Sequence, residues 1–538
     1  MKFAMQNCMT ELSMVSGKTY RDPFNEIEVD MAITDPNGEE QLVPAFWAGD
    51  NVWRVRFSTP LVGRHSYRTV CSDNSNQDLH GREGYLEVTP YIGSNRLLMH
   101  GRLRMSQDRR HLEHKDGTPF LWLADTWWMG LVKRLGWPEE FQMLAADRVA
   151  KGFSVIQIIA GLYPDMPPFD DRGANEAGFP WEQDYSRVNP AYFDMADLRI
   201  GWLVASGLVP CIVGCWGYFI DFAGVEAIRK HWRYLLARYG AYPVVWCMAG
   251  EVLMPYYLNE KVRTPQGAEE YRVRARRDWS DVTRYLRSID PYKHPITAHS
   301  GGGDGSRNMV DEDLVDIDLL QTGHGDRESI PNTVRQVVRF SKEEPRIPVI
   351  DGEVCYEGIV EASRQEVQRF MFWACMLSGA AGHTYGANGI WQVNTKAQPF
   401  GPSPHGSSWG DTPWEEACKL PGSSHVGIGK RLLERYQWWR FEPHPEWAEP
   451  HAGEENYVRP YAAGIPGEVR LLFIPGFAGL SAVKGIEPGV NYKAFYFDPK
   501  NGREYPLGDV TPDSGGDWAP PKPVIFQDWV LVLERVRL

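Results

Sequence analysis

The chain has 538 residues, a length that at roughly 100 to 200 residues per domain predicts about three or four domains and excludes one small binding module. Hydrophobic residues make up 43% and charged residues 24%, ordinary values for a globular protein that exclude a disordered or fibrous chain. The net charge of −13 lacks the basic footprint of a nucleic-acid-binding protein, so no nucleic-acid partner is expected.

The first ninety residues predict a β domain. Residues 27–33 and 52–57 alternate apolar and polar side chains, and Asp35-Pro36-Asn37-Gly38 is a turn signal between them. Short alternating strands joined by tight turns are typical of a β-sandwich. We therefore expect an N-terminal β-sandwich over residues 1–93.

From residue 94 to residue 441, apolar runs of strand length alternate with amphipathic helical segments. The runs cover residues 119–126, 153–160, 208–217, 243–251, 294–300, 315–321, 347–353 and 381–385. Eight continuous apolar strands that alternate with helices predict a parallel (β/α)8 TIM barrel. A doubly wound open sheet is the rival, but neither a GxGxxG motif nor a P-loop supports it. After this segment the pattern is β-like again, which predicts a C-terminal β-sandwich over residues 442–538.

The sequence gives no signal for export, membrane insertion or a metal. Residues 1–20 contain no apolar run of signal-peptide length, and the longest apolar stretch, residues 370–377, is too short to span a bilayer. The eight cysteines form no CxxC pair and no Cys/His cluster with zinc spacing. We therefore expect a cytoplasmic protein with reduced thiols, no membrane partner, no cofactor and no metal site, and we leave a homo-oligomer open.

TIM barrels place their chemistry at the C-terminal ends of the strands. The polar and aromatic residues expected there are Asp125, Trp127, Trp128, Gln157, Trp216, Glu251, His299, Gln321, His324, Glu353, Tyr385, Asn388 and Trp391. The fourth and seventh runs both end in Gly-Glu, at Glu251 and Glu353, and these strands lie on opposite sides of an eight-stranded ring. Two carboxylates that face each other across a cavity are the arrangement that glycoside hydrolysis requires. We predict that these two glutamates are catalytic and that the other residues bind a carbohydrate substrate.

Other roles remain open for several of these residues. A single glutamate at a strand end can cap a helix or pair with arginine, and Glu357 and Asp351 are the rival carboxylates, which we interpret as supporting structure. His299 and His324 can hydrogen-bond sugar hydroxyls, pack structurally or bind a metal. About half of the tryptophans at strand ends are expected to fill the core, and the others to stack against sugar rings.

Several sequence blocks resemble a known family. Residues 117–128, 297–299, 321–324 and 352–358 are similar to the signature blocks of apiosidase-like glycoside hydrolases, and residues 22–63 to the immunoglobulin-like domain that often precedes such barrels. The resemblance implies a TIM barrel after an immunoglobulin-like β-sandwich. It also implies a retaining mechanism, with the acid/base after strand four (Glu251) and the nucleophile after strand seven (Glu353).

The block after strand four departs from that pattern. Apiosidases carry Gly-Gly-Asp there, where this chain has Ala249-Gly250-Glu251, and broader retaining barrels have Asn at the position of Gly250. The identity of the sugar is therefore left open. We predict a retaining O-glycosidase that is exo-acting on a small plant-type glycoside or oligosaccharide. An inverting glycosidase, a transglycosylase and a non-catalytic carbohydrate-binding protein are the alternatives.

Overall fold

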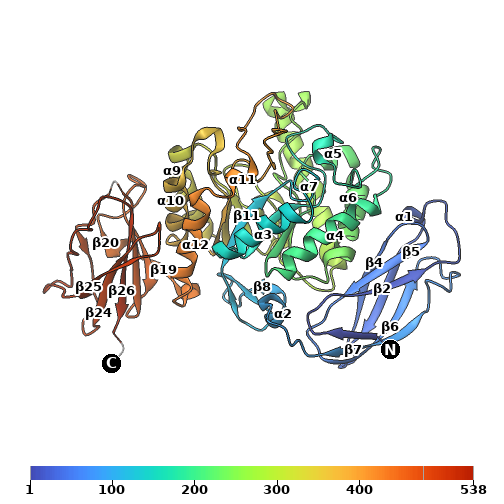
Figure 1. Cartoon of the computed structure of the whole chain (residues 1–538), viewed down its shortest axis with the longest axis horizontal. Helices are drawn as coiled ribbons and strands as arrows, with labels where there is room; N and C mark the ends of the chain where they lie inside the picture. The colour runs from blue at the N-terminus through green and yellow to red at the C-terminus, as the bar shows by residue number, and fades with distance from the viewer. Residues whose placement is uncertain (1, 477, 537–538) are drawn as a thin grey trace.

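The structure is a computed structural model that describes residues 2–476 and 478–536, so the outermost ends of the expected terminal domains lie outside it. A barrel occupies the centre, with an N-terminal β domain (blue) on one side and a C-terminal β domain (red) on the other (Figure 1). Within the described residues, no helix combines the length and the apolar character needed to cross a membrane.

The N-terminal domain is a seven-stranded sheet with the order β1-β7-β6-β3-β4-β5-β2. Its strands are β1 (Lys2–Met5), β2 (Thr10–Val15), β3 (Val29–Thr34), β4 (Glu40–Trp47), β5 (Val52–Phe57), β6 (Gly63–Cys71) and β7 (Glu83–Thr89). Strand β4 pairs with β3 through its first half and with β5 through its second half. A strand that changes partners in this way turns the sheet through a corner and lets its two parts enclose a core.

The N-terminal domain packs against the barrel through aromatic side chains. Phe24 lies edge-on to Trp181 and Tyr234, with ring centroids 5.7 Å and 6.1 Å away. The Tyr234 hydroxyl also donates a hydrogen bond of 2.9 Å to the carbonyl of Trp47. The interface between the N-terminal domain and the barrel therefore combines aromatic packing with a hydrogen bond.

The central sheet has eight strands in the order β15-β14-β13-β12-β11-β18-β17-β16. In chain order they are β11 (Trp122–Trp127), β12 (Val155–Ile159), β13 (Val209–Val213), β14 (Val245–Cys247), β15 (Ile296–Thr297), β16 (Asp318–Gln321), β17 (Val349–Glu353) and β18 (Gly382–Tyr385). Seven of them lie inside one apolar run each, and β11 extends one residue beyond its run, to Trp127. The order excludes the open-sheet rival and confirms the TIM barrel, with β14 and β17 well apart around the ring.

Hydroxyl side chains help to close the barrel between β15 and β16. Thr297 Oγ1 donates to the carbonyl of Ile317 at 3.0 Å, and Ser306 Oγ accepts from the amide of Leu319 at 2.8 Å. Ser300 Oγ accepts from the amide of Gln321 at 3.1 Å. These bonds replace part of the backbone ladder, and they hold the segments that carry His299 and Gln321.

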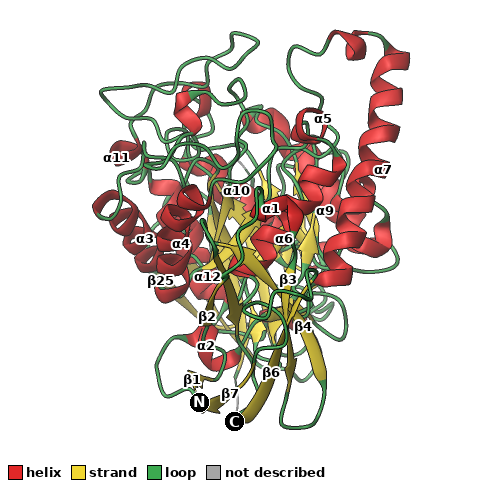
Figure 2. Cartoon of the chain, turned by 90° about the vertical axis from the view of Figure 1, so that its right-hand side faces the viewer, coloured by secondary structure: helices red, strands yellow, loops and turns green. Residues whose placement is uncertain are grey.

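Helices surround the strands, and loops gather at one end of the barrel (Figure 2). The long barrel helices are α3 (Glu139–Lys151), α4 (Pro190–Ala205), α6 (Val225–Tyr239), α7 (Pro265–Ile289), α9 (Ile330–Lys342), α10 (Gln365–Met376) and α12 (Pro421–Leu433). Helix α4 begins where the Asn189 side chain accepts from the amide of Ala191, and α3 ends at Gly152 in the left-handed region. Helix α12 begins at Pro421, whose fixed backbone angle suits the first turn of a helix.

The C-terminal domain has a six-stranded sheet with the order β19-β21-β22-β26-β24-β25. Its strands are β19 (Glu442–Pro443), β21 (Tyr461–Ile465), β22 (Val469–Ile474), β24 (Tyr492–Phe497), β25 (Glu504–Asp509) and β26 (Trp529–Arg535). Along β22, Leu471 and Phe473 belong to the core shared with the barrel, whereas Leu472 and Ile474 belong to a separate core of this domain. Both faces of this sheet are thus buried, one of them against the barrel helices.

Candidate active site

Glu353 enters the barrel because of an irregularity in β17. Leu320 pairs with Asp351 and the next residue, Gln321, pairs with Glu353, so Gly352 is an extra residue in the ladder. A bulge interrupts the alternation of side chains and redirects the residue that follows it. A Cβ at Gly352 would lie 2.3 Å from Cγ of Leu319, so this position has no room for a side chain.

Nitrogen donors surround the Glu353 carboxylate, which is 5% exposed. His324 Nε2 lies 2.8 Å and Gln321 Nε2 3.2 Å from Oε1, and His299 Nε2 lies 3.2 Å from Oε2. Burial alone would raise the pKa of Glu353, but hydrogen bonding to the two histidines and their positive charge hold it well below its usual range. The same interaction raises the pKa of His324 against the opposing effect of burial. Glu353 is therefore ionised.

Glu251 follows β14 in a strained backbone conformation. Its φ is +40°, in the left-handed region that residues with a side chain rarely adopt. The carbonyl of Glu251 accepts from the amide of Met254 at 2.8 Å, and the amide of Val252 bonds to the carbonyl of His299 at 3.1 Å. A tight turn thus presents the half-buried Glu251 side chain at the end of its strand.

Gly250, where related barrels carry Asn, lies under the ring of Trp216. The two residues form a parallel bridge, and a Cβ at Gly250 would lie 2.1 Å from Cε3 of Trp216. No side chain fits between them. The sequence departure at Gly250 is therefore coupled to the tryptophan that packs on it.

The pKa of Glu251 is displaced in the opposite direction from that of Glu353. Burial raises it to about 7, and the negative charges of Glu353 and Asp165 add to the increase. The charge of His299 and a hydrogen bond with Gln321 act against it. The site thus holds one protonated and one ionised carboxyl group. Glycoside hydrolysis needs both, since the protonated group acts as the acid and the ionised group as the nucleophile or base.

Aromatic rings form a wall beside the two glutamates. Trp128 lies edge-on to Trp216 and to His299, with ring centroids 5.8 Å and 5.5 Å away. The Trp128 indole nitrogen donates to the Tyr356 hydroxyl at 3.1 Å, and the Tyr356 ring stacks on Trp391 at 6.0 Å. Flat apolar rings next to polar groups suit the faces and hydroxyls of a sugar.

A third carboxylate, which was not among the residues predicted from sequence, lies near this pair. Asp165 comes from the connector after β12 and has a φ of +58°. Burial raises its pKa, and a hydrogen bond from the Tyr257 hydroxyl, 3.1 Å from Oδ1, opposes that effect. The Tyr257 ring lies 5.1 Å from His405, and His405 lies 6.4 Å from Trp409. The sequence analysis did not identify Asp165, because no strand pattern marks an individual loop residue.

Three of the predicted binding residues contact the outer layer instead. Asp125 is fully buried and pairs with Arg148 of α3 at 2.6 Å, and its carboxylate also accepts from the Trp127 indole nitrogen at 2.7 Å. The Tyr385 hydroxyl donates to Glu357 at 2.6 Å. The structure thus places Asp125, Trp127 and Tyr385 between the barrel and its helices, and we assign them to that interface because their polar atoms are used there.

Two further predicted residues, Gln157 and Asn388, contact the backbone at Gly352 and Glu357. Gln157 donates to the carbonyl of Gly352 at 3.1 Å and so supports the bulge before Glu353. The backbone amide of Asn388 donates to the carbonyl of Glu357 at 2.9 Å. Among the described residues, Oε1 of Gln157 and Oδ1 of Asn388 have no hydrogen-bond partner. Both oxygens can therefore accept from a ligand.

A separate cavity of about 560 Å³ lies between α9, α10 and the C-terminal domain. Apolar residues such as Val338, Leu377 and Trp438 line it, together with several arginines. None of the residues that surround Glu251 and Glu353 lines this cavity. Its size does not make it the active site, because the paired carboxylates with displaced pKa values lie elsewhere.

Comparisons with known proteins agree with this geometry. A family model described as "Apiosidase-like, catalytic domain" matches residues 106–440, and a model of a domain of unknown function, DUF5060, matches residues 6–72. A solved structure named as a putative glycoside hydrolase from Bacteroides vulgatus matches with a TM-score of 0.71 at 17% identity, covering 100% of both chains. A glycoside hydrolase family 5 structure from the same organism has a TM-score of 0.65 at 21% identity, covering 81% of this chain and 93% of its own. A search of curated proteins found no match.

The solved structures support the fold, and the family match supports the chemistry. The family match shows that the protein is a glycosidase, and the expected carbohydrate substrate agrees with that class. Since the family model covers more than half of the chain, the chain belongs to the apiosidase-like family of glycoside hydrolases. This confirms the resemblance seen in the sequence blocks.

Proposed function

We propose that the protein is a retaining O-glycoside hydrolase in which Glu353 is the nucleophile and Glu251 is the acid/base. The opposite displacement of the two pKa values carries this proposal: the pKa of Glu251 is raised to about 7, and that of Glu353 is held low by His299 and His324. In a retaining mechanism one carboxyl group must protonate the leaving oxygen while the other attacks as an anion. The charge of Glu353 acts directly on Glu251, so the proton is held where it is needed.

The surrounding loops support exo-action on a small glycoside. Asp165, Tyr257 and His405 come from the connectors after β12, β14 and β18, and they contact one another beside the catalytic pair. The first and last of these connectors also meet at Arg172, which donates to the carbonyl of Phe400 at 3.1 Å. Loops that close over one side of a barrel favour a pocket that accepts a chain end. The plant-type character of the substrate rests on the family alone.

We further propose that the protein acts in the cytoplasm on an imported glycoside. All eight cysteines are free thiols, and seven of them are buried, as expected for a protein of a reducing compartment. Expression with and without an export signal tests this location. Higher specific activity of the exported, oxidised protein would contradict it.

The test of the mechanism is a comparison of Glu251→Ala with Glu353→Ala. A panel of nitrophenyl glycosides first identifies the sugar. Glu251→Ala should still form the glycosyl-enzyme from an activated aryl glycoside, and azide should restore turnover with retained anomeric configuration, because azide needs no general base. Glu353→Ala should form no covalent intermediate, and any azide product should have the inverted configuration.

Glu328→Ala is the matched control, because Glu328 is an exposed carboxylate in the short 3-10 helix Asp326–Ser329 after β16 and should keep wild-type activity. Loss of either catalytic group is expected to reduce activity on an unactivated glycoside by about 10²- to 10⁴-fold. Azide products with the reverse stereochemistry would exchange the two roles. A wild-type product with inverted configuration would favour the inverting alternative. A disaccharide product formed in excess over hydrolysis would favour the transglycosylase.

A further inference from the structure

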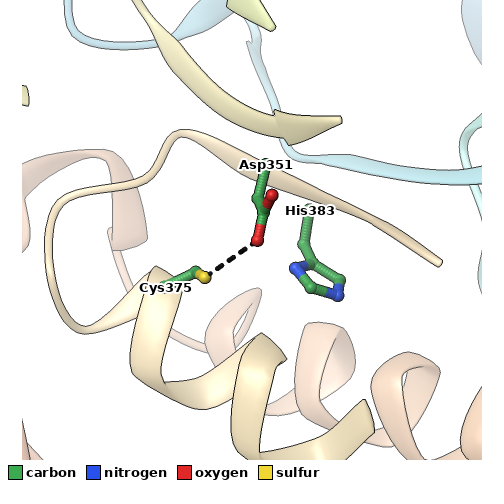
Figure 3. A group of neighbouring side chains, drawn as sticks. All are labelled: Asp351, Cys375 and His383. Carbon is green, nitrogen blue, oxygen red and sulfur yellow. Dashed lines mark hydrogen bonds between the residues drawn. The ribbon is translucent and has the colours of Figure 1, made fainter. Parts of the chain in front are cut away.

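Three side chains with metal-binding atoms meet on the side of β17 that faces the helices, away from Glu353. They are Asp351 from β17, Cys375 from α10 and His383 from β18, and Figure 3 shows them facing one another across the gap between strands and helix. One donor atom from each lies within 4.8 Å of the other two, and all three residues are fully buried. Cys375 Sγ donates a hydrogen bond to Asp351 Oδ2 at 3.1 Å.

The register of the barrel produces this group. Asp351 and His383 are direct partners in the parallel pairing of β17 with β18, so their side chains emerge from neighbouring points of the sheet. Because Gly352 interrupts the alternation, Asp351 points toward α10 while Glu353 points into the barrel. Cys375 lies on the face of α10 that covers this point. Spacing in the sequence could not reveal the group, since its members come from three separate elements.

The unpaired ring of His383 also points to a ligand at this group. Its side chain has no exposure, and within the described residues neither of its ring nitrogens has a hydrogen-bond partner. A buried, neutral imidazole has one N–H donor and one acceptor nitrogen, and leaving both unpaired is costly. The ring of Phe372 lies edge-on at 5.6 Å and offers no polar atom. A metal ion would bind one of the two ring nitrogens that the protein leaves unpaired.

We propose that Asp351, Cys375 and His383 bind one structural zinc ion. Thiolate, imidazole and carboxylate are the donors that Zn²⁺ prefers, with bonds of about 2.0 to 2.3 Å. The charges also balance, since one thiolate, one carboxylate and a neutral imidazole neutralise the two positive charges of the ion. Binding releases the Cys375 thiol proton to solvent. The fourth position of a tetrahedron would be taken by a water molecule.

This site is structural and separate from the chemistry at Glu353. The ion would connect β17 and β18 to α10, on the side of β17 that faces the helices. Because all three ligands are fully buried, the ion must enter during folding, and chelators should remove it from the folded protein only slowly. Activity of the folded enzyme should therefore survive brief treatment with EDTA, whereas refolding in EDTA should give protein with a lower Tm than refolding with zinc.

The test is the metal content of tag-free protein expressed with added zinc and then desalted. We expect elemental mass spectrometry to find close to one equivalent of zinc per chain. Refolding with Co²⁺ instead should give a thiolate-to-cobalt charge-transfer band in the near ultraviolet. Cys375→Ser should lose the metal and the band. Cys211→Ser, which changes an equally buried cysteine of β13, should keep both.

Wild-type protein without bound metal, or wild-type protein refolded with cobalt that lacks the band, would overturn the proposal and leave Cys375 and Asp351 as a hydrogen-bonded pair beside His383. These two measurements need no variant, so misfolding of Cys375→Ser cannot obscure the result. Loss of the metal from Cys211→Ser as well would place the ion elsewhere and would also overturn it. The catalytic proposal is unaffected by any of these outcomes, because its test is the stereochemistry of the azide products.

Discussion

The pH dependence of hydrolysis should report the protonation of Glu251. A carboxyl group with the ordinary pKa of 4.5 would be protonated in only about one molecule in 300 at neutral pH, whereas a pKa of about 7 keeps about half of the molecules protonated. At about one pH unit above that pKa, about one molecule in eleven retains the proton, so kcat/KM should fall to about a tenth of its plateau. The acidic limb, set by Glu353, should lie well below the usual carboxyl range.

The substitution Asp165→Asn tests the electrostatic cause of the raised pKa of Glu251. The negative charge of Asp165 contributes to the raised pKa of Glu251, so neutralising it should move the basic limb of the profile to lower pH. The shift should be smaller than the total displacement, because burial and the charge of Glu353 are the larger causes. Asp170→Asn is the control, because Asp170 lies in the same loop but pairs with Arg172 at 2.9 Å.

The assay is kcat/KM against pH with an unactivated alkyl glycoside of the sugar found in the panel. An activated aryl leaving group needs little protonation and would hide the basic limb. A profile that stays flat to about two units above neutrality would refute the assignment of Glu251 as the acid. An unchanged basic limb in Asp165→Asn, or an equal shift in Asp170→Asn, would refute the electrostatic coupling.

Three further outcomes are expected. Gly352→Ala should destabilise the protein by about 1 to 3 kcal/mol and reduce kcat, because its Cβ would overlap Leu319; Gly453→Ala, which meets open space, should change neither quantity in the same assays. Asp125→Asn should lower the free energy of unfolding by about 3 to 5 kcal/mol in urea, since it breaks a buried ion pair with Arg148; an increase in KM with unchanged stability would instead restore Asp125 to the substrate site. Short EDTA treatment of the folded enzyme should leave kcat unchanged, and loss of activity that one divalent ion restores would show that the chemistry itself needs a metal.

Local pattern was sufficient to predict the strands, the barrel and its catalytic pair of glutamates as candidates. A parallel strand buried on both faces must be a continuous apolar run, and two such runs on opposite sides of the ring both end in Gly-Glu. Glu251 and Glu353 could therefore be selected without coordinates. The loop residue Asp165 could not be selected in this way, because it lies outside the apolar runs.

The direction in which each side chain points depended on the tertiary structure. Asp351 and Glu353 are two residues apart and would share a face of a regular strand, but the bulge at Gly352 sends one to α10 and the other into the barrel. Asp125 and Tyr385 stand at strand ends, as expected, yet they face outward to Arg148 and Glu357. A sequence fixes which residues end a strand, because burial along the chain is a local pattern. Which face receives a side chain is decided by ladder register and by the helix that packs there, and both are set by residues far away in the chain.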